Sequence, residues 1–287
     1  MSSIKTLGVE HEHEHKHEDG PEPEPEPQPI RIAILLNSYR SRLLPAIRAS
    51  YERTIGAVAP DARLAFYEPA NKTGHGQFPD PAFFDLIVFG GSNVDPRKSH
   101  PWILDVHRFL RRLVAQYPEK KILGICWGHQ TISRVFGGKV VDAPRPEMGV
   151  ADVTLTAAGR KFFPAFASAG ALKLQQHHRR EVSRAPPGFA PLARGNQCLL
   201  GAGNTILTFQ GHPEKDAEAA RLRLHDSLRW FGFDARLDEK AWLRLCESVE
   251  MQHDGAAVWA RVFEWLREPP TRLGPDGDGN GVVDGNN

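Results

Sequence analysis

The stretch KKILGICWGHQTISRVF, residues 120–136, contains the transition that decides the fold. Its first six residues, two lysines followed by the apolar ILGI, predict a buried parallel strand, and residues 130–136 have a helical pattern. Between them lie residues 124–128 (GICWG), in which a reactive side chain, Cys126, stands two residues after one glycine and two residues before another. This spacing predicts a sharp strand-to-helix turn, in which the glycines avoid side-chain clashes and Cys126 projects from the end of the sheet.

The alternation of strand and helix continues on both sides of this stretch. Short apolar runs predict further strands at 31–37, 63–68, 83–90, 149–156, 171–178 and 204–211. Helical periodicity predicts helices at 41–55, 102–117, 215–230 and 239–267, the last with a break at Gly255. Strands that alternate with helices pair in parallel, so we expect an α/β fold with a mostly parallel central sheet and helices on both faces.

The composition excludes several classes of protein. The chain has 287 residues, of which 40% are hydrophobic and 25% charged, with a net charge of +1. No apolar run reaches the roughly 18 residues that span a bilayer, and the N-terminus lacks the apolar core of a signal peptide. Three cysteines are an odd and sparse set, which argues against a disulfide framework and favours a reducing compartment. We therefore expect a cytoplasmic protein without a membrane segment.

The chain divides by composition into three parts. Residues 1–29 are rich in His, Glu and Pro and nearly free of aliphatic side chains, so they predict an acidic, disordered leader. Residues 30–268 predict one mildly basic catalytic domain. Residues 269–287, rich in Gly, Asp and Asn, predict a disordered tail.

Two stretches outside the predicted domain have metal-ligand spacing. The alternating histidines of residues 11–19 can bind divalent transition metals loosely, although a solvated low-complexity tail has the same composition. Residues 276–287 follow the spacing of a calcium loop, but Asn287 stands where the bidentate carboxylate is needed. We expect neither a metal site nor a cofactor.

A cysteine nucleophile needs a base and an orienting group, and residues 209–214 (FQGHPE) offer both. They follow an apolar strand. His212 and Glu214 are two residues apart, so an extended backbone points both side chains the same way. One imidazole nitrogen can then face the sulfur of Cys126 while the other donates to the carboxylate. The start of a helix beside Cys126 also favours the thiolate over the thiol.

Together, the motifs GICWGHQ and FQGHPE resemble those of the class I glutamine amidotransferase family, the triad glutaminases. The resemblance extends over most of residues 31–230 and implies flavodoxin-like layering of the sheet and helices. It implies a triad of Cys126, His212 and Glu214. In that family the cysteine attacks a γ-glutamyl amide carbon, expels ammonia, and leaves a thioester that water cleaves.

The resemblance also implies roles for groups around the triad. The backbone N–H groups of Trp127 and Gly91 correspond to the oxyanion hole. Gln130 matches a position that helps to hold the glutamyl substrate, and His178 falls in the region that shapes the substrate pocket. Ser92 departs from the family pattern, because many members have proline there.

Residues 101–104 and 120–123 are more similar to stand-alone members of the family, which include plant γ-glutamyl peptidases and fungal amidotransferase-like proteins. We therefore expect a stand-alone hydrolase. Its substrate is either glutamine, with ammonia supplied to a separate acceptor or synthase protein in secondary metabolism, or a γ-glutamyl peptide such as a glutathione-like conjugate. A non-catalytic binding module with the same fold is the alternative from another class. We expect no nucleic-acid binding, because arginines are spread over the helices without an aromatic-basic cluster.

Overall fold

The structure is a computed structural model. It describes residues 28–38, 40–70, 76–231 and 239–271, with side chains excepted for 227–231. Most of the predicted leader and tail, with the stretches 11–19 and 276–287, lies outside the described residues. The predicted domain boundaries at both ends therefore stay predictions.

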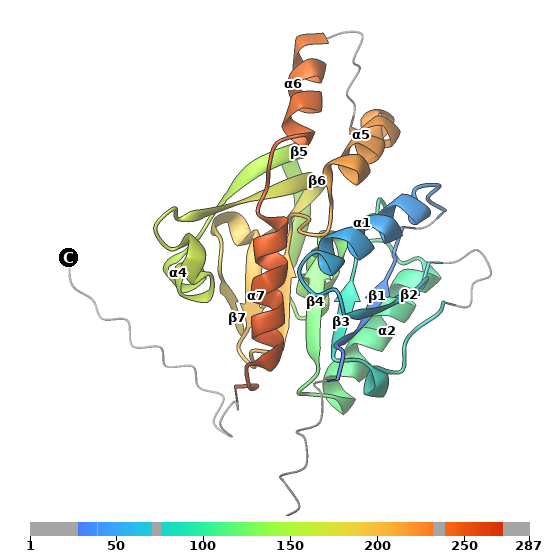
Figure 1. The fold of residues 1–287 in the computed structure, drawn as a ribbon. Coiled ribbons are helices and arrows are strands. Elements are labelled where there is room, and N and C mark those ends of the chain that lie inside the picture. The colour runs from blue at the N-terminus through green and yellow to red at the C-terminus, as the bar shows by residue number, and fades with distance from the viewer. Residues whose placement is uncertain (1–27, 39, 71–75, 232–238, 272–287) are drawn as a thin grey trace, which may run out of the picture.

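A seven-stranded sheet forms the centre of the molecule (Figure 1). Its strands in spatial order are β2 (Arg63–Tyr67), β1 (Arg31–Leu35), β3 (Leu86–Phe89), β4 (Lys121–Ile125), β9 (Ile206–Phe209), β8 (Cys198–Gly201) and β7 (Phe189–Pro191). The first five are parallel, whereas β8 and β7 are each antiparallel to the preceding strand. This sheet confirms the predicted α/β fold. We did not predict β7 and β8, which are too short to show a periodic pattern.

Helices cover both faces of the sheet, so its central strands are apolar on both sides. In β1, Ile32 and Ile34 pack on one face and Ala33 and Leu35 on the other. The helices of the first face are α1 (Leu44–Gly56) and α7 (Gly255–Arg267), and those of the second are α2 (Pro101–Gln116) and α3 (Trp127–Val135). The layering that the family resemblance implies is therefore present.

A second, two-stranded antiparallel sheet lies beside the central one (Figure 1). Its strands are β5 (Lys139–Thr154) and β6 (Ala171–Arg184), both longer than the apolar runs that predicted them. Two short helical segments, α4 (Ala157–Phe162) and η2 (Pro164–Phe166), connect β5 to β6. In the central sheet, η1 (Pro81–Phe83) precedes β3, and η3 (Arg194–Asn196) lies between β7 and β8. The backbone N–H of His212 donates to the carbonyl of Gln175 in β6, at 2.9 Å. This contact joins the second sheet to the end of β9.

The C-terminal part is helical, as predicted, with α5 (Ala217–Phe231) and α6 (Glu239–Val249) before α7. The expected break at Gly255 occurs just before this residue, which begins α7 instead of ending a helix. A Cβ at Gly255 would lie 2.5 Å from the carbonyl oxygen of Pro213, so the start of α7 packs directly against the His212–Glu214 segment. None of the described helices has the length and apolarity needed to cross a membrane.

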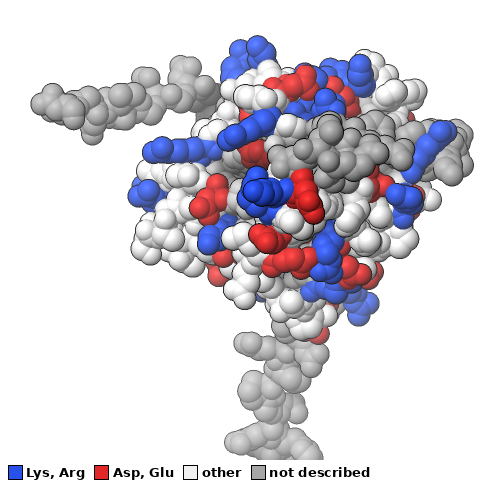
Figure 2. All heavy atoms as spheres, turned by 90° about the horizontal axis from the view of Figure 1, so that it is seen from above, with Lys and Arg blue, Asp and Glu red and all other residues white. Residues whose placement is uncertain are grey.

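Charged side chains of both signs are interspersed on the face that Figure 2 shows. On the described part of this face, Lys and Arg side chains lie next to Asp and Glu side chains. The basic excess of the body therefore does not gather there into one continuous surface.

Candidate active site

Cys126 occupies a strained turn between β4 and α3. Its φ is +52° and its ψ is −100°, a conformation that L-residues rarely adopt. The two flanking glycines make room for the turn, because a Cβ on Gly128 would lie 1.9 Å from the carbonyl oxygen of Phe89 and one on Gly124 would lie 2.6 Å from Ile132 Cδ1. The local geometry is that of a nucleophile elbow, as residues 124–128 predict.

His212 and Glu214 form a buried pair at the end of β9. His212 Nδ1 lies 2.7 Å from Glu214 Oε1, and each side chain is only 6% exposed. The hydroxyl of Ser50 in α1 donates to the backbone carbonyl of Glu214, at 2.7 Å, and holds this segment in place. His212 Nε2 has no hydrogen-bond partner among the described residues, and His212 lines the same cavity as Cys126. One ring nitrogen is therefore oriented by the carboxylate and the other is free for chemistry.

The loop after β3 brings Gly91 next to both reactive side chains. A Cβ added at Gly91 would lie 3.3 Å from His212 Cε1 and 3.9 Å from Cys126 Cβ. No described residue accepts a hydrogen bond from the Gly91 backbone N–H. The backbone N–H of Trp127, at the start of α3, interacts with the Cys126 sulfur and favours its thiolate. The two groups that the resemblance implies for an oxyanion hole thus lie beside Cys126.

The resting protonation states differ from our expectation for the thiol. Burial raises the pKa of Cys126 to about 11, and it outweighs the nearby positive charges and the N–H of Trp127, which lower it. Burial also lowers the pKa of His212 to about 4, against the opposing effect of Glu214. At neutral pH the pair therefore rests as a neutral thiol and a neutral imidazole. The helix start favours the thiolate as expected, but desolvation is the larger effect.

Two cationic side chains near Cys126 were missed in the sequence. Lys215 and Arg223 both lower the pKa of Cys126, after burial has raised it. Burial lowers the pKa of Lys215 itself to about 8. The position of Lys215 directly after Glu214 was a signal that could have been used, whereas Arg223 reaches the site only because α5 packs over it.

Two cavities meet at Cys126. We call the first the α1–α5 cavity, because residues of α1 and α5 line it together with Cys126, His212 and Glu214. We call the second the Gln130 cavity, which Gln130, Cys126 and residues 177–180 line. Cys126 is thus accessible from both, while His212 lines only the first and Gln130 only the second.

The two predicted substrate-binding residues lie together in the Gln130 cavity. The Nε2 of Gln130 donates to the carbonyl of Arg180 at 2.8 Å and to Gln210 Oε1 at 3.0 Å, which orients its amide. His178 is buried, with its Nε2 3.3 Å from Oε2 of Glu147. Both residues therefore line a cavity that Cys126 also lines, and their role in substrate binding stays a prediction.

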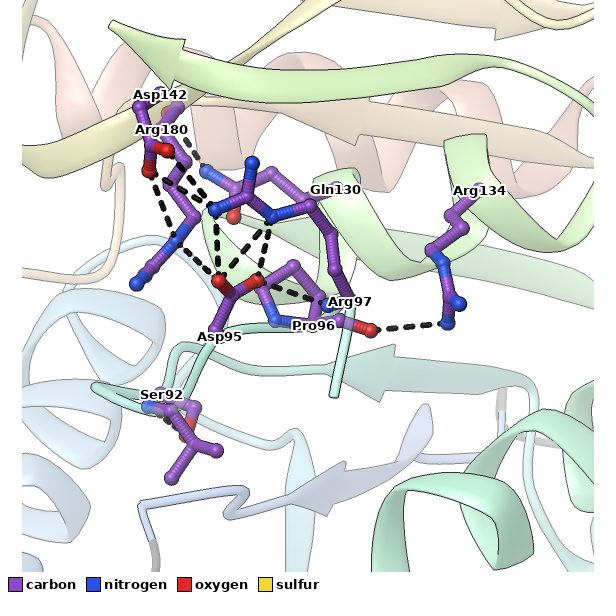
Figure 3. Close-up of polar contacts among 9 residues, drawn as sticks. Ser92, Asp95, Pro96, Arg97, Gln130, Arg134, Asp142 and Arg180 are labelled. Carbon is purple, nitrogen blue, oxygen red and sulfur yellow. Dashed lines mark hydrogen bonds and ion pairs between the residues drawn. The ribbon is translucent and has the colours of Figure 1, made fainter. Parts of the chain in front are cut away.

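An ion-pair network that the sequence did not reveal borders the Gln130 cavity (Figure 3). The guanidinium of Arg97 contacts Asp95 at 2.8 Å and Asp142 at 3.0 Å, and the Nε of Arg180 lies 3.2 Å from Asp95. Burial opposes ionisation of Asp95, but the hydrogen bonds of Arg97 and the charge of Arg180 hold its pKa at about 2. The network joins the loop after β3 to the second sheet and places charges of both signs at the cavity.

No group of three or more His, Cys, Asp or Glu side chains in the described part of the chain could hold a metal ion. The two stretches with metal-ligand spacing, 11–19 and 276–287, lie outside that part. The chemistry discussed below uses side chains and backbone groups of this chain.

Comparisons with known proteins place the site in a wider context. Residues 81–227 match the sequence model described as "Glutamine amidotransferase class-I". The chain is 33% identical over 243 residues to the glutamine amidotransferase-like protein chyE of Penicillium rubens, covering 83% of this chain and 98% of that one. It is 33% identical over 150 residues to gamma-glutamyl peptidase 2 of Arabidopsis thaliana, covering 50% and 60%. A glutamine amidotransferase structure from Thermotoga maritima has the same fold, with a TM-score of 0.61, 17% identity, and coverage of 83% and 99%.

Proposed function

The chain belongs to the class I glutamine amidotransferase family, and we propose that it hydrolyses a γ-glutamyl amide with a triad of Cys126, His212 and Glu214. The observation that carries this proposal is the buried His212–Glu214 contact of 2.7 Å, which leaves Nε2 of His212 free in the cavity that Cys126 lines. A base that is oriented on one side and free on the other is the arrangement that an uncharged thiol needs.

The reaction begins with a neutral pair. The sulfur of Cys126 attacks the γ-carbonyl carbon while its proton passes to Nε2 of His212, and Glu214 stabilises the imidazolium that forms. His212 then gives this proton to the amide nitrogen, the C–N bond breaks, and a γ-glutamyl thioester remains. A water molecule, deprotonated by His212, attacks the thioester and releases glutamate and the Cys126 thiol.

Transition-state charge is stabilised by groups that are already in place. The backbone N–H groups of Gly91 and Trp127 donate to the developing oxyanion. The positive charge of Lys215, which lowers the pKa of Cys126 in the resting protein, also stabilises a sulfur that becomes negative during proton transfer. Cys126 lines both cavities, so a substrate that occupies either of them can meet its sulfur.

The γ-glutamyl group occupies the Gln130 cavity in this proposal. Its free end carries an ammonium and a carboxylate, so a site of mixed charge suits it better than an apolar one. Asp95 and Arg180 line the cavity and carry charges for these two groups, and Gln130 and His178 line it as well. The three cysteines are free thiols, which supports a reducing, cytoplasmic location as a further part of the proposal.

Two substrates are compatible with this mechanism, because they differ only in the amine that leaves. Glutamine would release ammonia for a separate acceptor protein, and γ-glutamyl peptides would release a peptide or amino acid. Purified protein assayed with glutamine and with γ-glutamyl dipeptides separates the two. Glutamate released only from glutamine supports ammonia supply, and glutamate released only from dipeptides supports peptide hydrolysis.

Covalent labelling tests the proposal against a non-catalytic binding module. A glutamine-analogue electrophile should alkylate Cys126 in a stoichiometric, glutamine-protected reaction, with Cys198 and Cys246 as internal controls. Site-resolved mass spectrometry reads out all three. Alkylation of the two control cysteines without Cys126 would reject the enzyme proposal.

A further inference from the structure

The position of the general acid decides where the leaving amine lies. In the proposed mechanism His212 protonates the nitrogen that leaves, so this nitrogen must be next to Nε2 of His212. His212 lines the α1–α5 cavity and not the Gln130 cavity. The leaving amine therefore extends into the α1–α5 cavity, while the γ-glutamyl group extends to the other side of Cys126.

The α1–α5 cavity has apolar walls. Ala219 and Leu222 line it one helical turn apart on α5, and residues at and near the start of α1 line it with the same spacing. The apolar lining residues are Leu36, Leu43, Ala46, Ile47, Ala219 and Leu222. Leu222 is 41% exposed although it belongs to this wall. An apolar ligand would cover it, whereas ammonia is too small and too polar to use such a surface.

The same cavity is lined by a cation, Lys215, whose ammonium group forms no ion pair within the described residues. Lys215 is partly buried, and its ammonium group also forms no hydrogen bond within them. Two acidic residues flank Lys215 in the chain, but Glu214 directs Oε1 to His212 and Asp216 pairs with Arg53 at 2.7 Å. The charge of Glu214 raises the pKa of Lys215, but no ion pair forms between them. Removing a cation from water without a partner is unfavourable, so a ligand carboxylate at this position would be bound strongly.

A single ligand can contact both the apolar wall and Lys215. We propose that the leaving amine is an α-amino acid with an apolar side chain: the side chain lies on the α1–α5 wall and the carboxylate pairs with Lys215. This inference rests on the proposed hydrolase function and specifies its substrate class as γ-glutamyl derivatives of apolar amino acids. Glutamine would use the catalytic groups, but its leaving ammonia would contact neither the wall nor Lys215.

Four substrates separate the parts of this proposal: glutamine, γ-glutamylglycine, γ-glutamylleucine and γ-glutamylisopentylamide, which is the leucine compound without its carboxylate. Glutamate release is measured for each, with Cys126→Ser as the blank. Burying a leucine side chain predicts a kcat/KM about 10- to 100-fold higher for γ-glutamylleucine than for γ-glutamylglycine. A ratio near one would overturn the apolar site.

Matched variants test the wall. Leu222→Gln should lower the ratio of kcat/KM for γ-glutamylleucine over γ-glutamylglycine about threefold to tenfold. Leu104→Gln is the control, because Leu104 is similarly exposed, at 39%, but lies on α2 and lines neither cavity. It should leave the ratio unchanged. An equal change in the two variants would overturn the assignment of the wall.

The contact between Lys215 and the substrate carboxylate is tested by comparing two substrates that differ only in this carboxylate. Lys215→Met should lower kcat/KM for γ-glutamylleucine about fivefold to tenfold more than for γ-glutamylisopentylamide. If Lys215 acts only on the Cys126 sulfur, both substrates lose equally, and the carboxylate contact is overturned. If glutamine or γ-glutamylglycine is cleaved without any preference for leucine, the substrate class fails and the hydrolase function stands. If none of the four is cleaved, both proposals fail.

Discussion

Replacing Glu214 by glutamine tests the triad most directly, because it removes one charge and keeps the size of the side chain. Nδ1 of His212 and Oε1 of Glu214 are 2.7 Å apart, which puts the centres of the two charged groups roughly 4 Å apart. At an effective dielectric constant of about 20, the imidazolium then loses about 4 kcal/mol of stabilisation. Since about 1.4 kcal/mol corresponds to a factor of ten, kcat should fall about 10³-fold.

The same substitution should make the thiol of Cys126 more acidic. The charge of Glu214 raises the pKa of Cys126 on top of the larger effect of burial, so its removal lowers that pKa. The pH dependence of Cys126 alkylation by iodoacetamide, followed by site-resolved mass spectrometry, should shift to lower pH. Slower turnover with a more acidic thiol would show that Glu214 acts through His212 and not on the sulfur.

A second His–Glu contact offers the matched control. Nε2 of His178 lies 3.3 Å from Oε2 of Glu147, whose side chain is 40% exposed. Solvent reaches the Glu147 carboxylate and screens its charge, so the contact contributes at most about 1 kcal/mol, and Glu147→Gln should lower kcat less than about fivefold. Glu214→Gln activity within fivefold of the wild type, in protein with an unchanged circular dichroism spectrum, would refute the role of Glu214.

Three further outcomes are expected. Cys126→Ser should abolish glutamate release while the thermal unfolding midpoint is kept; retained turnover would exclude Cys126 as the nucleophile. Gly128→Ala forces a Cβ to 1.9 Å from the Phe89 carbonyl oxygen and should lower the free energy of unfolding by about 1–3 kcal/mol. Gly56→Ala, where a Cβ meets open space, should raise this free energy by about 0.5–1 kcal/mol. Urea unfolding measures both, and equal effects of the two variants would contradict the packing around Gly128. Burial lowers the pKa of His129 to about 3 in the folded state, so the unfolded chain binds the extra proton and stability falls as pH drops below about 6.5. His129→Gln should reduce this pH slope of the unfolding free energy by about 1.4 kcal/mol per pH unit, and an unchanged slope would contradict a buried neutral imidazole.

The sequence predicted those features that depend on residues close together in the chain. The elbow at residues 124–128 needs glycines at both ends, because a Cβ at either position would clash with neighbouring atoms. The two glycines are recognisable in the sequence. Apolar runs identified the parallel strands for a similar reason, since a strand covered on both faces must be apolar throughout. The spacing of His212 and Glu214 likewise predicted a contact that the structure contains.

Tertiary structure decided the features that depend on segments far apart in the chain. The second sheet, the Asp95–Arg97–Asp142–Arg180 network and the approach of Lys215 and Arg223 to Cys126 arise from packing between elements, which no local pattern encodes. The protonation state of Cys126 is the clearest case. The sequence showed the helix start that favours a thiolate, but burial raises the pKa of Cys126 to about 11, because desolvation depends on everything that folds around the sulfur. The sequence by itself identified the side chains that we propose react. The fold decided their protonation states and the two cavities that meet at Cys126, because both depend on segments far apart in the chain.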